Sequence, residues 1–254
     1  MVRKVCIMDL ETQYIGSDFS DPKVLRSEGT LGLIGILVPT PTSIQTYYWS
    51  PDENQCGAST NLKHMVKFLL KFNRIVGFNS VGFDNPCIEG VINREFPEKA
   101  DSLAGSLRRR SFDMNILLRQ MGCFSGLDNI CQTISDFGKT EDSSQIPHMW
   151  KRGEHQKVRN YLERDLRMTL FMYNYALLKG KIKHTMGLNS RYYIGTKWFQ
   201  ERAVRVNFAR EYILEANGNQ YKRKKKSKKE VYLPPYSDLN FIFPKHAKKG
   251  KAHV

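Results

Sequence analysis

The sequence is poor in cysteine and has no long apolar run. Its 254 residues include five cysteines: Cys6, Cys56, Cys87, Cys123 and Cys131. No two of them form a C-x-x-C pair, so neither a disulfide framework nor a zinc knuckle is predicted. No apolar stretch approaches the roughly 20 residues of a membrane span. The short apolar segment at the start is too brief for a signal peptide, so we expect an intracellular protein that does not bind membranes.

Positive charge, by contrast, is in excess. The formal net charge is +15 at pH 7, and residues 201–254 hold 14 Lys and Arg against 5 Asp and Glu. An excess of positive charge that is concentrated in one part of the chain favours a polyanionic partner, usually nucleic acid. The segment Lys222–Lys229 (KRKKKSKK) is almost purely cationic, and we expect it to be solvated, mobile and in contact with nucleic acid. The alternatives are a solubility device or a localisation signal, which would make the protein nuclear rather than cytoplasmic.

Hydrophobic patterning predicts strands first and helices later. Both faces of Val5–Leu10 are apolar, which is typical of a buried strand. The other predicted elements are a hairpin of Leu31–Val38 with Ser43–Trp49, a helix over Asn61–Phe72, strands over Ile75–Phe78 and Arg109–Phe112, and a helix over Val158–Leu178. This order indicates an α/β domain with a mixed central sheet over residues 1–180. A basic C-terminal extension, partly disordered, is expected over residues 181–254.

Two acids, Asp9 and Glu11, stand at the end of the first predicted strand. Because side chains alternate along a strand, a spacing of two puts both on one face, side by side. Two buried carboxylates so close would repel each other unless a cation neutralised them. Mg²⁺ and Mn²⁺, which prefer oxygen ligands, suit such a site.

A third acid, Asp84, follows the strand and turn of Val76–Pro86 (VGFNSVGFDNP). On its own it could equally be the N-cap of the next helix. A fourth, Asp165, stands one helical turn after Tyr161, so that the phenol and the carboxylate share a helix face. An amphipathic helix with an ordinary core tyrosine is the alternative here. Glu163 and Arg164, between them, are expected to face solvent.

Taken together, these motifs resemble those of the DEDD superfamily of 3′→5′ exonucleases. Asp9-Leu10-Glu11-Thr12 matches the D-x-E motif, Asn79 through Asp84 match the second motif with a longer spacer, and Tyr161 with Asp165 match the Tyr-x-x-x-Asp of the tyrosine branch. The histidine branch would need His where this chain has Asn160. Residues 5–178 are similar in layout to predicted ribonuclease H-like exonuclease domains and to the proofreading domain of family-B DNA polymerases.

The resemblance implies a three-layer ribonuclease H-like fold and metal-dependent hydrolysis of DNA or RNA from a single-stranded 3′ end. Two ions, Mg²⁺ or Mn²⁺, would be held by four carboxylates: Asp9 bridging both ions, Glu11 and Asp165 completing the first, and Asp84 holding the second. Tyr161 would orient the attacking water. The candidate substrate contacts are Asn79, Thr12 and Lys139, although Asn79 could instead fix its loop and Lys139 could be a solvated surface lysine.

Two other functions stay open at this point. One is a structure-specific endonuclease on the same fold, which a comparison of linear with circular substrates would separate from an exonuclease. The other is a non-catalytic nucleic-acid-binding module. The intact acids count against that module, because a binding surface gains affinity by losing negative charge. Nothing in the sequence distinguishes DNA from RNA or identifies a protein partner.

Overall fold

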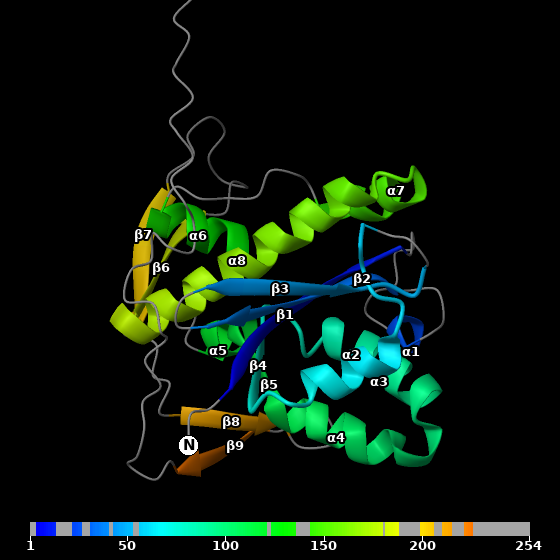
Figure 1. The fold of residues 1–254 in the computed structure, drawn as a ribbon. Helices are drawn as coiled ribbons and strands as arrows, with labels where there is room; N and C mark the ends of the chain where they lie inside the picture. The colour runs from blue at the N-terminus through cyan, green and yellow to red at the C-terminus, as the bar shows by residue number, and fades with distance from the viewer. Residues whose placement is uncertain are drawn as a thin grey trace, which may run out of the picture.

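A five-stranded mixed sheet forms the centre of the computed structural model, which describes residues 4–13, 22–26, 31–40, 43–52, 56–120, 123–135, 143–179, 181–187, 199–205, 210–214 and 221–225 (Figure 1). Its strands are β1 (Val5–Thr12), β2 (Leu31–Pro39), β3 (Ile44–Trp49), β4 (Arg74–Gly77) and β5 (Ser111–Asp113). The strand order is β3-β2-β1-β4-β5. β1, β2 and β3 pair antiparallel, whereas β1, β4 and β5 are parallel. The predicted mixed sheet and ribonuclease H-like topology are confirmed.

Strand β1 lies in the middle of the sheet and is buried on both faces. Cys6, Met8 and Leu10 belong to the hydrophobic core on one side. Val5 and Ile7 belong to the core on the other side. Asp9 and Glu11 continue the row that Val5 and Ile7 begin, because successive side chains of a strand alternate between its faces.

Helices cover both faces of the sheet and complete the three layers (Figure 1). The Met8 face is covered by α1 (Pro22–Leu25), α2 (Leu62–Leu69), α3 (Asp84–Glu95) and α4 (Ala100–Arg110). The Ile7 face is covered by α5 (Met114–Gln120), α6 (Leu127–Ser135), α7 (Ile146–Lys151) and α8 (His155–Lys179). Short 3₁₀ turns, η1 (Pro97–Lys99) and η2 (Ser143–Gln145), precede α4 and α7. Asp9 and Glu11 therefore point into the layer that holds α8.

A glycine lets α8 approach the sheet closely at the acids. Gly35 of β2 is the register partner of Asp9. A Cβ at Gly35 would lie 2.6 Å from Cδ1 of Leu166 and 3.2 Å from Cδ2 of Leu162, both on α8. Both leucines are fully buried. The absence of a side chain at Gly35 thus brings this stretch of α8, which includes Asp165, against β1 and β2.

The strand predicted to begin at Arg109 begins later, at Ser111. Arg108, Arg109 and Arg110 form the last turn of α4, where cations interact favourably with the helix dipole. The Nε of Arg108 donates to Glu89 of α3 at 2.5 Å, and Nη1 of Arg110 donates to the carbonyl of Phe72 at 3.1 Å. Arg108 and Arg110 thus tie the end of α4 to its neighbours.

Beyond α8 the chain forms two antiparallel strand pairs, β6 (Lys181–Gly187) with β7 (Phe199–Arg205) and β8 (Arg210–Leu214) with β9 (Tyr221–Lys225). β6 packs against α6 and α8, and Ile182 is fully buried in the core. A domain boundary at residue 180 stays a prediction. Lys222–Lys225 lie in β9 and pair with β8, and residues 226–229 lie outside the described residues. The mobility of Lys222–Lys229 stays a prediction.

Candidate metal and nucleic-acid site

Three of the predicted acids meet where β1 passes α8. One carboxylate oxygen from each of Asp9, Glu11 and Asp165 lies within 4.8 Å of the other two. Tyr161, one turn before Asp165, is buried like Asp165, and both line the same cavity. Three hard oxygen donors of like charge at this separation suit a divalent cation such as Mg²⁺ or Mn²⁺. The donor set therefore fits the expected first metal ion.

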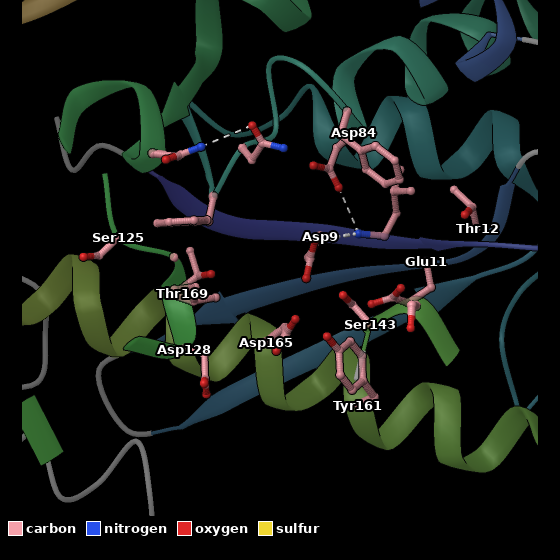
Figure 2. Close-up of a pocket in the computed structure, with 18 of the residues that line it drawn as sticks. Asp9, Glu11, Thr12, Asp84, Ser125, Asp128, Ser143, Tyr161, Asp165 and Thr169 are labelled. Atoms are coloured by element: carbon pink, nitrogen blue, oxygen red, sulfur yellow. Dashed lines mark hydrogen bonds between the residues drawn. The ribbon is translucent and has the colours of Figure 1, made fainter. Parts of the chain in front are cut away.

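Asp84 reaches the site from the other helical layer and stands outside that group of three. Its Oδ1 accepts a hydrogen bond from the backbone N–H of Leu10 at 3.0 Å. Figure 2 shows Asp84 and Asp165 on opposite sides of Asp9. The N-cap interpretation is wrong, because Asp84 is the first residue of α3 and its cap, Phe83, makes no side-chain hydrogen bond. Burial, together with the negative charge of Asp113, raises the pKa of Asp84 to about 7.

Asp113, at the end of β5, holds the loop that leads into Asp84. Its Oδ1 accepts from the N–H of Asn79 at 3.0 Å, and its Oδ2 accepts from the N–H of Val81 at 2.9 Å. Asn79 has φ 66°, in the left-handed region that asparagine tolerates better than most residues. Asp113 also accepts from the N–H groups of Asn115 and Ile116 and so caps α5. The loop is thus fixed by Asp113, a buried carboxylate that belongs to none of the three sequence motifs.

A cavity of about 1030 Å³ joins these elements. All but one of the predicted site residues line it: Asp9, Glu11, Thr12, Asn79, Asp84, Tyr161 and Asp165. The exception, Lys139, lies outside the described residues. Thr12 is buried just past an irregularity in the β1–β2 ladder. The cavity therefore gathers the motif residues from β1, the loop after β4, the start of α3, and α8.

Several lining residues were not predicted. They are Asn115, Arg119, Phe124, Ser125, Asp128, Ser143, His148 and Thr169, among others. Asp113 and Asn115 follow a predicted strand end at the edge that carries Asp9, and this position was a usable signal. Phe124 and His148 carry no such signal, because only the tertiary fold brings them to the cavity.

The cavity is acidic. Its described lining contains the five carboxylates of Asp9, Glu11, Asp84, Asp128 and Asp165. Among the described residues that line it, Arg119 is the only lysine or arginine. A phosphodiester would meet strong repulsion here unless cations neutralised the carboxylates.

The outer face of α8 anchors the helix to the edge of the sheet. The hydroxyl of Tyr48 on β3 donates to Oε2 of Glu163 at 2.8 Å, and Nη2 of Arg167 lies 2.7 Å from Oε1. Burial alone would raise the pKa of Glu163, but the bonds from Arg167 and Tyr48 outweigh it and lower the pKa. Glu163, predicted to face solvent, is half-buried: it is partly exposed and also bonded to Tyr48.

No protein-family model and no curated protein matches the sequence. Among solved structures, the family B DNA polymerase from the hyperthermophilic archaeon Pyrobaculum calidifontis aligns with a TM-score of 0.50 at 16% identity, covering 69% of this chain and 25% of the polymerase. Two structures of exonuclease I, one of them product bound, align with TM-scores of 0.34 and 0.36 at 12% and 11% identity; they cover 66% and 70% of this chain and 42% and 44% of their own.

The chain thus spans a quarter of the polymerase and less than half of these exonuclease I chains. The likeness to the polymerase shows a shared fold. Among the described residues, no helix is both long enough and apolar enough to cross a membrane.

Proposed function

We propose that this protein is a metal-dependent 3′→5′ exonuclease that hydrolyses the phosphodiester bonds of DNA or RNA. The observation that carries the proposal is the meeting of Asp9, Glu11 and Asp165 within 4.8 Å inside a large cavity. A structural acid rarely stands beside two others, because like charges destabilise one another. The ribonuclease H-like topology and the motif resemblance support the same conclusion.

Asp9, Glu11 and Asp165 would hold one divalent ion, and Asp9 together with Asp84 would hold a second. When bound, the two ions supply an activated water and a counter-charge for the leaving 3′ oxygen. Asp9 is suited to bridge, since it stands between Asp84 and the other two acids (Figure 2). The hydrogen bond from the Leu10 N–H to Asp84 holds that carboxylate against β1.

Tyr161 would orient the attacking water through its hydroxyl. Its ring packs in the buried core of α8, so little conformational freedom remains to the phenol. The same residue lines the cavity one helical turn from Asp165. The assignment of the 3′ end as the starting point rests on the motif resemblance of Tyr161 and Asp165.

The test is digestion of single-stranded DNA and RNA, labelled at either the 5′ or the 3′ end, with Mg²⁺, Mn²⁺ or EDTA. A 3′→5′ exonuclease shortens the 5′-labelled strand stepwise and releases the 3′ label as a mononucleotide. The full-length Asp9→Asn variant, matched in size, serves as the control for contaminating nuclease. Activity undiminished in EDTA would overturn the metal mechanism. Cutting of a circular strand would favour an endonuclease, and binding without hydrolysis would favour a binding module.

A further inference from the structure

One wall of the cavity is built from a hydrogen-bonded row of side chains. The Nε of Arg119 donates to Oδ1 of Asn115, and Nδ2 of Asn115 donates to Oδ1 of Asn79, both at 3.2 Å. The backbone N–H of Asn115 donates to Asp113 at 2.9 Å. Arg119 is exposed, and its guanidinium donates to Asn115, whose backbone is held by the same carboxylate that fixes the loop before Asp84.

Phe124 lines the same cavity as this row. It is 72% exposed, and Tyr47 is the other large hydrophobic residue exposed within the described part of the chain. One exposed apolar side chain is ordinary in itself. An aromatic ring that shares a cavity wall with the only described lysine or arginine there is less ordinary, because flat rings and cations together bind single-stranded nucleic acid.

The cavity has two distinguishable ends. Figure 2 shows Ser125, the neighbour of Phe124 in the chain, at the opposite end of the row of acids from Thr12. A strand whose scissile phosphate lies at the acids and whose terminal nucleotide points toward Thr12 would extend toward Ser125 and Phe124. The nucleotide that meets Phe124 is then on the 5′ side of the one removed.

We propose that Arg119 and Phe124 form a subsite for an unpaired nucleotide upstream of the scissile bond, Arg119 binding its phosphate and Phe124 stacking on its base. This inference rests on the proposed exonuclease function for the polarity of the strand. The guanidinium offers paired N–H donors that match phosphate oxygens. The ring stacks on any base, so the subsite reads no sequence. A base held in a duplex cannot lie on the ring, so the substrate is a 3′ end with at least two unpaired nucleotides.

The stacking of Phe124 on a base is tested by measuring strand binding in the full-length Asp9→Asn variant, which we expect not to hydrolyse the strand. Anisotropy of a labelled single strand is measured for a series of strands, each with one abasic site at a successive position from the 3′ end. Adding Phe124→Ala should weaken binding to the intact strand about 5- to 100-fold, the range of one base–aromatic stack. Phe124→Tyr should bind as the parent does. Tyr47→Ala, which removes an exposed aromatic outside the cavity lining, is the matched control and should also bind as the parent does.

The abasic series separates stacking from a general loss of affinity. In the parent, an abasic site at one position near the 3′ end should lower the binding affinity about as much as Phe124→Ala does. In Phe124→Ala, an abasic site at that position should lower the affinity no further. Equal losses at every position, or no loss from Phe124→Ala on the intact strand, would overturn the assignment of Phe124.

The phosphate half is tested by the dependence of binding on salt. Arg119→Ala should lower the slope of log K against log salt concentration by about 0.7, the value for one bound phosphate on a single strand. Arg94→Ala removes an exposed arginine of α3 that does not line the cavity and should leave the slope unchanged. An unchanged slope for Arg119→Ala would overturn its role. Neither test requires hydrolysis. An inactive wild-type protein would contradict the exonuclease proposal, whereas the two binding tests would still decide the roles of Phe124 and Arg119.

Discussion

Helix α3 carries two buried carboxylates whose surroundings are opposite in charge. Asp84, at its start, is 2% exposed, and Glu89, five residues later, is 4% exposed. Glu89 accepts hydrogen bonds from Arg26 at 2.8 Å and from Arg108 at 2.5 Å. Asp84 stands beside the acids of β1, and burial with the charge of Asp113 raises its pKa to about 7. Burial also acts on Glu89, but its two arginines outweigh it and lower the pKa.

The contrast separates an acid that is neutralised within the chain from an acid that we propose to hold a metal ion. Glu89 has its counter-ions within the chain, so its charge is compatible with burial and stabilises the packing of α1, α3 and α4. Asp84 faces Asp9 and, beyond it, Glu11 and Asp165. Such a group gains stability from a bound cation and costs stability without one. Acids placed next to acids are therefore the signature of the site.

The largest effect is expected at Asp9, the proposed bridging ligand. Asp9→Asn keeps the shape of the side chain but removes the charge shared by both ions. Hydrolysis of a single strand should fall by at least about 10³-fold, because the ions supply several kcal/mol of transition-state stabilisation. Binding of the strand, measured by anisotropy, should persist or tighten, because a negative charge is removed. A rate within tenfold of wild type would contradict the role of Asp9.

Tyr161 should have a smaller effect on the same reaction. Tyr161→Phe retains the buried ring and removes only the hydroxyl that would orient water. We expect the single-turnover rate to fall by about 10²-fold or less, as for one positioned group. Thermal unfolding of the variant should match wild type. A normal rate in Tyr161→Phe, accompanied by reduced stability in Tyr161→Ala, would make Tyr161 a core residue only.

Glu89 should affect stability and leave the chemistry intact. Glu89→Gln leaves two arginines without their carboxylate, and we expect a loss of about 1–3 kcal/mol in the free energy of unfolding. This is less than for a fully buried pair, because both arginines are partly exposed. The fold lowers the pKa of Glu89 below its unfolded value, so the stabilisation is complete above the unfolded pKa and disappears as pH falls through the folded one.

Urea unfolding of wild type and Glu89→Gln between pH 7 and pH 3 checks both expectations. The difference between the two proteins should shrink as the pH falls. A constant difference across this range would show that the ion pair is not its source.

The basic segment should give the smallest effect, confined to affinity. Replacing Lys222, Lys224 and Lys225 with Gln retains the β8–β9 pairing in the backbone while removing charge. The catalytic rate at saturating substrate should stay unchanged. The salt dependence of single-strand binding should become shallower by up to about 0.7 for each phosphate that the variant no longer binds. Identical salt slopes for wild type and variant would leave the segment without a role in gripping nucleic acid.

The sequence predicts the central strand and the acidic motifs better than the other residues that line the cavity. The apolar row of β1 and the i, i+4 pair of Tyr161 and Asp165 are local periodicities, and each local pattern indicates where its side chains point. The meeting of Asp9 with Asp165 was predicted from the motif resemblance, and the mixed sheet from the order of strands and helices. The order of the strands within the sheet was not predicted. Arg109 and Arg110 were assigned to a strand but end a helix, because a basic run ends a helix as readily as it enters a strand.

The side-chain hydrogen bonds of the cavity wall could not be predicted, although Asn79 itself was predicted to lie at the site. Asn79, Asn115 and Arg119 become neighbours only when β4, β5 and α5 pack together, and no periodicity marks such a row. The hydrogen bond of Glu163 was missed because its partner, Tyr48, lies 115 residues earlier in the chain. Side-chain pairs between distant segments depend on tertiary structure, which local spacing does not encode.

Calorimetric titration of Mn²⁺ into metal-free protein tests the central claim most directly. Wild type, Asp9→Asn and Glu89→Gln would be compared at a temperature where circular dichroism shows all three to be folded. We predict that wild type and Glu89→Gln bind two Mn²⁺ ions alike, and that Asp9→Asn loses at least about tenfold in affinity and binds fewer ions. Equal Mn²⁺ binding by wild type and Asp9→Asn would contradict the assignment of these acids as a metal site.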